Sequence, residues 1–429
     1  CLRNLEMQWL LCGLAPNYHS IADFRKQNPT GLKSLFKLFV SFLKDADLVA
    51  GEIIAIDGTK SRAHNSKKAN FSQKKIDKHL AYIEEKTQQY LEQIEQNDTQ
   101  ENNTNINNIQ AKIERLKTNK INYELLAEKL KASGEPQIST TDQDARALLV
   151  QGVVVEVSYN IQAAVDHKHN LVVATHTINR NDRNALAAIA LEAKENLEVE
   201  SFTVLVDKGY HNGRELAQCK EANITTIVAH PEPGISNENG TTKEYLVANF
   251  TYNKEADTYI CPANQHLKTT GKWHKKTRER DSYQFKKYRT PACKECPVKS
   301  LCTSRKGGRE IDRSQYADAV EENNKRYQEN AQLYRKRQEI NEHIFGTIKR
   351  QWGYNHTNLT GLEKVNGEHN LIMLVYNIKR SINILGVADL IAKLKNWKSP
   401  YKAKVLFYLN WTCLKLFRAS YINQTTYLA

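Results

Sequence analysis

Apolar and polar positions along the chain predict two buried strands that each end in an acid. Residues 53–56 form an uninterrupted apolar run, typical of a strand buried on both faces, and Asp57 and Gly58 follow it directly. Residues 202–206 form a second, mostly apolar run, which leads into Asp207 with a glycine two residues later. If these strands are parallel neighbours, both carboxylates emerge at the same edge of one sheet.

Two carboxylates at one sheet edge predict a particular chemistry. Neighbouring acids repel each other, and a divalent cation between them is the usual way to offset that repulsion. The pattern therefore predicts a carboxylate–metal site built on Asp57 and Asp207. The simpler alternative is that each aspartate caps the turn or helix after its strand. The recurrence of the pattern in a basic chain favours the metal site.

The pattern around these two strands alternates between strand and helix. Residues 153–166 predict one long strand, and residues 171–176 predict a strand that pairs back on it as a hairpin. The other predicted elements are helices over 183–197 and 214–222 and a strand over 224–228. This order predicts an α/β fold with a mixed, five-stranded, ribonuclease-H-like sheet, in which the first and fourth strands are parallel neighbours.

We expect this core to be interrupted and flanked by segments with other patterns. Residues 73–133 space their apolar positions alternately by four and three, which predicts two long helices packed as an antiparallel coiled-coil hairpin. The predicted parts are a helical N-terminal domain over 1–50, the ribonuclease-H-like core over 51–230 with its 73–133 insertion, a Cys-rich insertion over 231–310, a helical C-terminal part of the core over 311–385, and a tail over 386–429. For the N-terminal helices, DNA binding and a packing role are equal alternatives.

The charge balance indicates a polyanionic partner. Lys and Arg number 62 against 48 Asp and Glu, and the net charge of +14 favours nucleic acid over a generally basic protein. Hydrophobic residues make up 40% of the 429 residues, enough for a large core. No apolar run has membrane-spanning length and no signal peptide is evident, which predicts a cytoplasmic protein. Since the chain begins with Cys1 rather than Met, we expect its true start to lie upstream.

Half of the eight cysteines cluster in one stretch. They are Cys261, Cys293, Cys296 and Cys302. A C-x-x-C pair with two further cysteines, in a reducing compartment, predicts a tetrahedral zinc site with a structural role; buried thiols are the alternative. The same stretch holds basic and aromatic residues that fit either a DNA-contacting surface or a solvated one. These are Lys272, Trp273, Lys275, Lys276, Arg278, Arg280 and Tyr283.

A later helix carries a further candidate acid. Arg335, Glu342 and Lys349 lie seven residues apart, two helical turns each, so they share one face. Glu342 is a candidate third metal ligand, with the two basic residues near phosphate; a surface salt-bridge ladder is the alternative. Arg62 begins a basic loop at the edge where Asp57 lies, and this loop either contacts phosphates or is solvated.

At these residues the chain resembles the DDE transposases of bacterial insertion sequences, over roughly residues 5–385. The matching motifs are Ile56-Asp57-Gly58-Thr59-Lys60, Tyr159-Asn160-Ile161-Gln162-Ala163-Ala164-Val165-Asp166, Asp207-Lys208-Gly209-Tyr210, Glu342-His343-Ile344-Phe345-Gly346-Thr347-Ile348-Lys349-Arg350 and Tyr376-Asn377-Ile378-Lys379-Arg380. The resemblance implies a catalytic triad of Asp57, Asp207 and Glu342. Many relatives carry a Tyr-x-x-Arg-x-x-x-Glu-x-x-x-x-x-x-Lys signature.

This sequence keeps only parts of that signature. Glu342 and Lys349 keep the Glu–Lys spacing, and Tyr334 and Arg337 keep the Tyr–Arg spacing, but Arg337 lies one residue too far from Glu342. The rival third acids are Glu339 and Glu368.

The resemblance and the residue chemistry together predict metal-assisted phosphoryl transfer. Two Mg²⁺ or Mn²⁺ ions held by the triad are expected to support cleavage at transposon ends and attack of the freed 3′-hydroxyl on target DNA. The family also implies a homodimer in the synaptic complex. The residues expected to contact DNA are Lys60, Arg62, Lys208, Arg335, Lys349 and Arg350. The alternatives are an inactive, transposase-derived DNA-binding protein and a different metal-dependent nuclease on the same fold.

Overall fold

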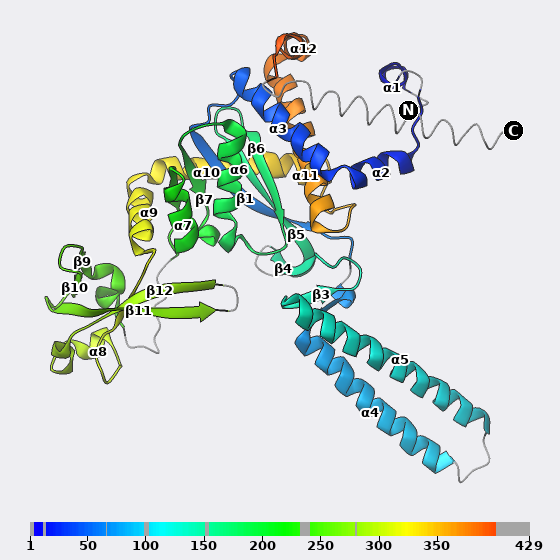
Figure 1. The fold of residues 1–429 in the computed structure, drawn as a ribbon, viewed down its shortest axis with the longest axis horizontal. Coiled ribbons are helices and arrows are strands. Elements are labelled where there is room, and N and C mark those ends of the chain that lie inside the picture. Colours follow the sequence, from blue (N-terminus) through cyan, green and yellow to red (C-terminus); the bar gives the residue numbers. More distant parts are fainter. Residues whose placement is uncertain are drawn as a thin grey trace.

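The computed structural model describes residues 4–11, 14–65, 67–97, 103–150, 154–231, 241–278 and 281–399 (Figure 1). The predicted tail beyond residue 399, and Arg280 in the predicted basic surface, lie outside the described residues.

A six-stranded mixed sheet forms the centre of the molecule. Its main path runs in the order β4-β5-β1-β7-β8, and β6 pairs with β5 beside β4. β1 is antiparallel to β5 and parallel to β7, and β7 is parallel to β8. The predicted mixed sheet, with parallel first and fourth core strands, is therefore confirmed, but it has six strands rather than the predicted five, because β4 adds to the edge of β5. The strands are β1 (Ile53–Arg62), β4 (Arg146–Val150), β5 (Val154–Asp166), β6 (Leu171–Ile178), β7 (Phe202–Val206) and β8 (Ile224–Val228).

The first strand is longer than the apolar run predicts. β1 pairs with β7 only over Ile53–Ile56, but it continues beside β5 as far as Arg62. Asp57 therefore lies inside β1, at the first position beyond its parallel partner, rather than at the end of the strand. The extra residues are polar, and the alternation of apolar residues gives no sign of them; the backbone pairing with β5 holds them extended.

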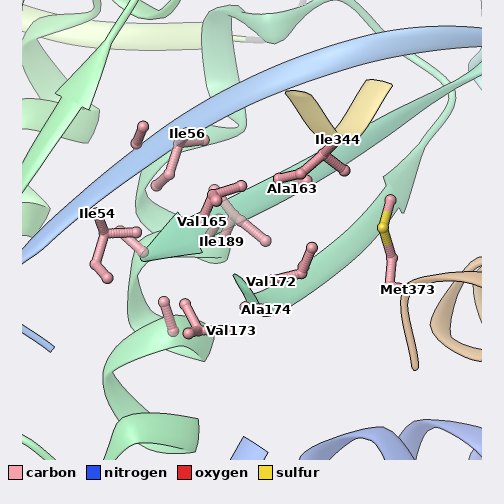
Figure 2. Close-up of a cluster of buried hydrophobic side chains, with 14 of the residues drawn as sticks. Ile54, Ile56, Ala163, Val165, Val172, Val173, Ala174, Ile189, Ile344 and Met373 are labelled. Atoms are coloured by element: carbon pink, nitrogen blue, oxygen red, sulfur yellow. The ribbon is translucent and has the colours of Figure 1, made fainter. Parts of the chain in front are cut away.

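Helices cover this sheet and bury its apolar side chains. α6 (Leu186–Leu197) contacts β1, β5 and β6, whereas α10 (Ala331–Phe345) contacts β1, β5 and β7. Figure 2 shows the centre of the resulting core, where Ile54, Val165 and Ile189 lie among other apolar side chains. The strands thus have apolar neighbours, as expected for continuous apolar runs.

The N-terminal region contains three of the predicted helices. They are α1 (Leu5–Leu10), α2 (Tyr18–Gln27) and α3 (Pro29–Asp45). α3 contacts α11 (Leu362–Leu385), α6 and β6, and its buried Phe36 and Val40 belong to the main hydrophobic core. The third helix is therefore part of the central unit.

Two long helices extend away from the sheet. α4 (Gln73–Asn97) and α5 (Asn103–Ser133) pack side by side, and the short strands β2 (Asn70–Ser72) and β3 (Gln137–Ser139) pair at their base (Figure 1). A separate small hydrophobic cluster lies at this base, formed by Phe71, Ile76 and Leu130. These helices occupy the region where the sequence predicts the hairpin.

A second sheet lies within the Cys-rich region. It has five strands in the order β13-β12-β11-β10-β9 and its own small hydrophobic cluster. The strands are β9 (Thr251–Asn253), β10 (Thr258–Ile260), β11 (His266–Arg278), β12 (Asp281–Arg289) and β13 (Ile311–Ser314). The sequence did not predict this sheet, because three of its strands are only three or four residues long. β11 and β12 form a long two-stranded ribbon (Figure 1).

The remaining helices lie between strands of the two sheets or after them. They are α7 (Gly213–Glu221), α8 (Lys299–Cys302), α9 (Ala317–Glu329) and α12 (Val387–Asn396). In the described part of the chain no single helix is long and apolar enough to cross a membrane. The pair α11 and α12, bent by 111°, meets the criterion by length and composition alone.

Candidate active site

Two acids from adjacent parallel strands flank one cation. Ile56 pairs with Val206 across β1 and β7, and the next residue in each segment is Asp57 and Asp207. The Arg337 guanidinium, from α10, lies between them. Its Nη1 is 3.6 Å from Asp57 Oδ2 and its Nη2 is 4.0 Å from Asp207 Oδ1. The sheet register thus brings together two acids that are 150 residues apart in the chain.

The electrostatics of Asp57 reflect this crowding. Burial raises the pKa of Asp57, and the nearby Asp182 and Asp207 carboxylates add to the rise. The Gly58 amide, which donates to Asp57 Oδ1 over 2.8 Å, and the Arg337 charge act in the opposite direction. Ionised Asp57 therefore depends on positive charge close by.

The donor set at this edge suits a hard divalent cation. Mg²⁺ and Mn²⁺ prefer carboxylate oxygens, and Arg337 already stands as a cation between the two aspartates. Within the described residues, however, no group of three or more His, Cys, Asp or Glu side chains is arranged to hold a metal ion. The fit is therefore that of an acid pair, with no third carboxylate among the described residues placed to share a metal ion with it.

Glu342 does not complete that pair. The buried face of α10 carries Ile340, Asn341 and Ile344, whereas Glu342 is exposed. Glu342 lies five positions after Arg337, which rotates it about 140° around the helix from the Arg337 side chain. The extra residue between Arg337 and Glu342, compared with the family's Tyr–Arg–Glu spacing, therefore places Glu342 on a different face of α10 from Arg337. The catalytic role of Glu342 stays a prediction.

The two rival acids have other environments. Glu339 is exposed on α10. Glu368, only 1% exposed, accepts hydrogen bonds from the Tyr354 hydroxyl and from the backbone amides of Asn358 and Leu359. Its carboxylate is also 3.7 Å from Arg25 Nη1 of α2. Glu368 therefore fastens a loop and an N-terminal helix to the core.

A carboxylate that the sequence analysis missed lies beside Asp57. Asp182 begins a short 3₁₀ turn four residues after β6. Burial opposes its ionisation, but the charge of Lys60 and hydrogen bonds from Asn160 and Gln162 lower the pKa of Asp182. The strand order contained a signal for the position of Asp182, because β6 and β1 both run antiparallel to β5. Both strands therefore end at the same edge of the sheet.

Three of the predicted DNA-contacting side chains are held by internal partners. Lys60 Nζ is 3.1 Å from Asp182 Oδ2, and Arg62 forms a two-point ion pair with Glu156. Lys349, in the π-helical segment Gly346–Gln351, donates to Thr59 Oγ1 and to the Lys60 carbonyl over 3.0 and 2.8 Å. Burial lowers the pKa of Lys349.

The other three predicted DNA contacts are exposed. Lys208 follows Asp207 directly, Arg335 lies on α10 and Arg350 lies next to Lys349. Lys208 lies next to one of the acids in the chain, whereas Arg335 shares the helix face of Glu342 and lies about 160° around α10 from Arg337. Their role in binding DNA stays a prediction.

The four clustered cysteines line one small pocket in the second sheet's region. All four are free thiols, and the Gln265 amide donates to Cys261 Sγ over 3.3 Å. Burial raises the pKa of Cys302; Arg309 opposes this rise and the other three cysteines add to it. Within the described residues they do not form a metal-binding group in this geometry, so the zinc site also stays a prediction.

Comparison with known proteins connects part of this site to a family. A protein-family model described as "Transposase DDE domain" matches residues 260–382. This stretch includes the four cysteines, Arg337, Glu342 and Lys349, but neither Asp57 nor Asp207. No curated protein and no solved structure gave a significant match.

Proposed function

Because residues 260–382 carry a transposase DDE domain, we propose that the protein is a DNA transposase that cleaves transposon ends and transfers the strand into target DNA. One observation carries the proposal. Asp57 and Asp207, which lie outside the matched residues, meet around Arg337, which lies inside them. The strand order, with β1 between an antiparallel β5 and a parallel β7, supports a ribonuclease-H-like core.

In this proposal the acid pair holds Mg²⁺ or Mn²⁺. Bound there, such an ion supplies Lewis-acid activation of the attacking oxygen and stabilises the leaving oxygen of the phosphodiester. Asp57 and Asp207 present the hard oxygen ligands that these ions prefer. Arg337 balances the two negative charges when no metal is bound.

Basic side chains near the pair give the DNA backbone a place to bind. Lys349 is fixed along β1 by Thr59 and the Lys60 carbonyl, so its charge stays close to the strand that carries Asp57. The exposed Lys208, Arg335 and Arg350 extend the positive surface. The net charge of +14 favours association with any polyanion, and Lys349 and Lys208 place positive charge next to the acids.

A second function has a specific observation in its favour. Glu342 is exposed and no third carboxylate joins the aspartate pair within the described part of the chain. A DNA-binding protein derived from a transposase, without cleavage activity, is consistent with that arrangement.

A cleavage assay distinguishes these functions. The protein is incubated with duplexes that carry the ends of its own element, in Mg²⁺, Mn²⁺, Ca²⁺ or EDTA, and nicking and strand joining are both measured. We expect nicking in Mg²⁺ or Mn²⁺ that EDTA abolishes. Asp57→Asn and Asp207→Asn should each reduce nicking by at least about a hundredfold, because a bound metal supplies several kcal/mol of stabilisation.

Matched variants make the result specific. Asp389→Asn changes an exposed acid on α12 and should leave nicking unchanged. Glu342→Ala, run beside Glu339→Ala on the same helix, tests the third acid. Nicking by either aspartate variant at the parent rate would overturn the proposal. DNA binding by the parent without nicking would support the inactive protein, and nicking without joining would support a nuclease.

A further inference from the structure

A mostly buried polar network lies beside Asp57. Asp182 is its centre: Oδ1 accepts from Asn160 Nδ2 over 2.8 Å and from Gln162 Nε2 over 2.9 Å. Its Oδ2 accepts from Lys60 Nζ over 3.1 Å. Asn160 and Gln162 project from β5 and are fully buried, whereas Lys60 belongs to β1. The Asp182 carboxylate thus ties together the two antiparallel strands beside the site.

Asp182 also lies against the backbone that follows each acid. A Cβ on Gly58, the residue after Asp57, would collide with the Asp182 and Gln162 side chains. A Cβ on Gly209, two residues after Asp207, would lie 3.9 Å from Asp182 Oδ2. The Asp182 side chain therefore sits between the two segments that carry the catalytic candidates.

A tyrosine extends the network to the turn after β7. The Tyr210 hydroxyl donates to Gln162 Oε1, and the Tyr210 amide donates to the Asp207 carbonyl over 3.1 Å. Tyr210 is 1% exposed, so these bonds form without competition from water. Hydrogen bonds shielded from water restrain the groups that they join, and this network reaches both acid-bearing segments, although Asn160 Oδ1 is buried without a partner.

We propose that Asp182 is a positioning residue of the active site, which holds the Asp57 and Asp207 segments at the separation that a shared divalent ion requires. The proposal rests on the proposed function, since it needs the two aspartates to bind metal. The proposal gives Asp182 no place among the metal ligands, because its oxygens accept from Lys60, Asn160 and Gln162 in this structure. It acts through the geometry of the two acids.

The test measures Mn²⁺ binding to the DNA-free protein, with free Mn²⁺ followed by electron paramagnetic resonance. The metal bound at the acid pair is the part lost in the Asp57→Asn, Asp207→Asn double variant. Groups that orient metal ligands typically affect metal affinity by about 10–100-fold when removed. We therefore expect Asp182→Asn to weaken this binding by about tenfold or more while leaving the DNA affinity near that of the parent.

Two further variants separate positioning from simple stability. Glu368→Gln alters another buried, hydrogen-bonded carboxylate away from the acid pair, and should lower the melting temperature without changing Mn²⁺ affinity. Tyr210→Phe removes only the hydroxyl that links Gln162 to the turn, and should weaken Mn²⁺ binding several-fold in a folded protein. If Asp182→Asn does not fold, Tyr210→Phe decides the question.

Three results would overturn the positioning role. The first is Mn²⁺ affinity equal to the parent in Asp182→Asn, or in Tyr210→Phe when that variant decides. The second is loss of Mn²⁺ binding in Asp182→Asn as complete as in the double variant, which would make Asp182 a direct ligand. The third is a parent protein that binds no Mn²⁺ at the acid pair, which overturns the proposed function and this proposal with it.

Discussion

Gly58 is a residue whose lack of a side chain decides the packing of the site. It lies beside Asp57, and a Cβ at this position would meet the side chains of Gln162, Asp182 and Asn160. These neighbours are mostly buried and hydrogen-bonded, so they have little freedom to move aside. The close approach of β1 to the Asp182 network therefore requires glycine.

We expect Gly58→Ala to destabilise the protein by about 1–3 kcal/mol, the usual cost of an added methyl group in a packed interior. Denaturant unfolding measures this free energy, and Mn²⁺ binding should weaken in parallel because the network shifts. Gly307→Ala is the matched control, since a Cβ on Gly307 meets nothing within 4 Å. Equal free energies of unfolding for the two variants would show that the Asp182 network rearranges around the added methyl group with little loss of stability.

The candidate acids differ in how far the sequence predicted them. Asp57 and Asp207 follow apolar runs, so their place at a sheet edge could be predicted from the pattern alone. Asp182 lies four residues beyond Ile178, in a polar turn, and its role depends on β5 running between β1 and β6. Heptad spacing gives Glu342 a face on its helix, but only the packing of α10 fixes which face meets the acids.

At the scale of elements, strand length and local patterning determined which elements could be predicted. Long apolar strands such as β5 and β6 and the extended helices α4 and α5 follow clear periodicities. β4 and three strands of the second sheet, β9, β10 and β13, are short, and the longer β11 and β12 are mostly polar. They exist because neighbouring strands supply their hydrogen bonds, which no local pattern reveals.

The ribbon of β11 and β12 is the element best suited to meet DNA outside the acid pair. Lys275 and Lys276 are exposed, and so is Trp273, which is 46% exposed and has Lys286 Nζ 5.2 Å from its ring centroid. A two-stranded ribbon fits the major groove, and successive side chains on a strand point to opposite faces. Positive charge therefore lies on both faces of this ribbon.

We expect the Lys275→Gln, Lys276→Gln double variant to bind duplex DNA about tenfold more weakly at low salt. The slope of log affinity against log salt should fall by about one for each phosphate that a lysine no longer neutralises. Fluorescence anisotropy over a salt series measures both quantities. The matched control is Lys393→Gln, Lys395→Gln on α12, which also removes two exposed lysines. Equal reductions in the two double variants would assign the effect to overall charge.

At the scale of the whole molecule, the described residues form three separate hydrophobic clusters. The largest joins the central sheet to its helices, and the smaller two lie in the second sheet and at the base of α4 and α5. The sequence predicted these regions as segments, but not which of them share a core. α3 was expected in an N-terminal domain, yet its buried Phe36, Val40, Phe42 and Leu43 belong to the central cluster.

Because α4 and α5 lie outside the main hydrophobic cluster, we expect that they can be deleted without disrupting the central core. The Thr140 amide donates to the Ala69 carbonyl over 2.9 Å, so the two ends of the excursion are hydrogen-bonded neighbours. Replacing residues 70–139 with two glycines joins these ends by a short turn and leaves every residue of the main cluster in place. The change removes the ion pairs of Glu135 with Arg146 and Arg180. The pair with Arg180 is partly exposed and contributes at most about 1 kcal/mol. Arg146 is buried, but its guanidinium still donates to the carbonyls of Gln143 and Ala145.

We therefore expect the shortened protein to fold and to keep the main unfolding transition within several degrees of the parent, as measured by scanning calorimetry. Phe36→Ala removes a buried side chain of the main cluster, and should lower that transition by the same amount in both chains, because distant sites add independently. A shortened protein that does not fold, or a Phe36→Ala effect that differs between the two chains, would show that α4 and α5 stabilise the central core. Intact folding without DNA binding would instead place these helices in recognition of DNA.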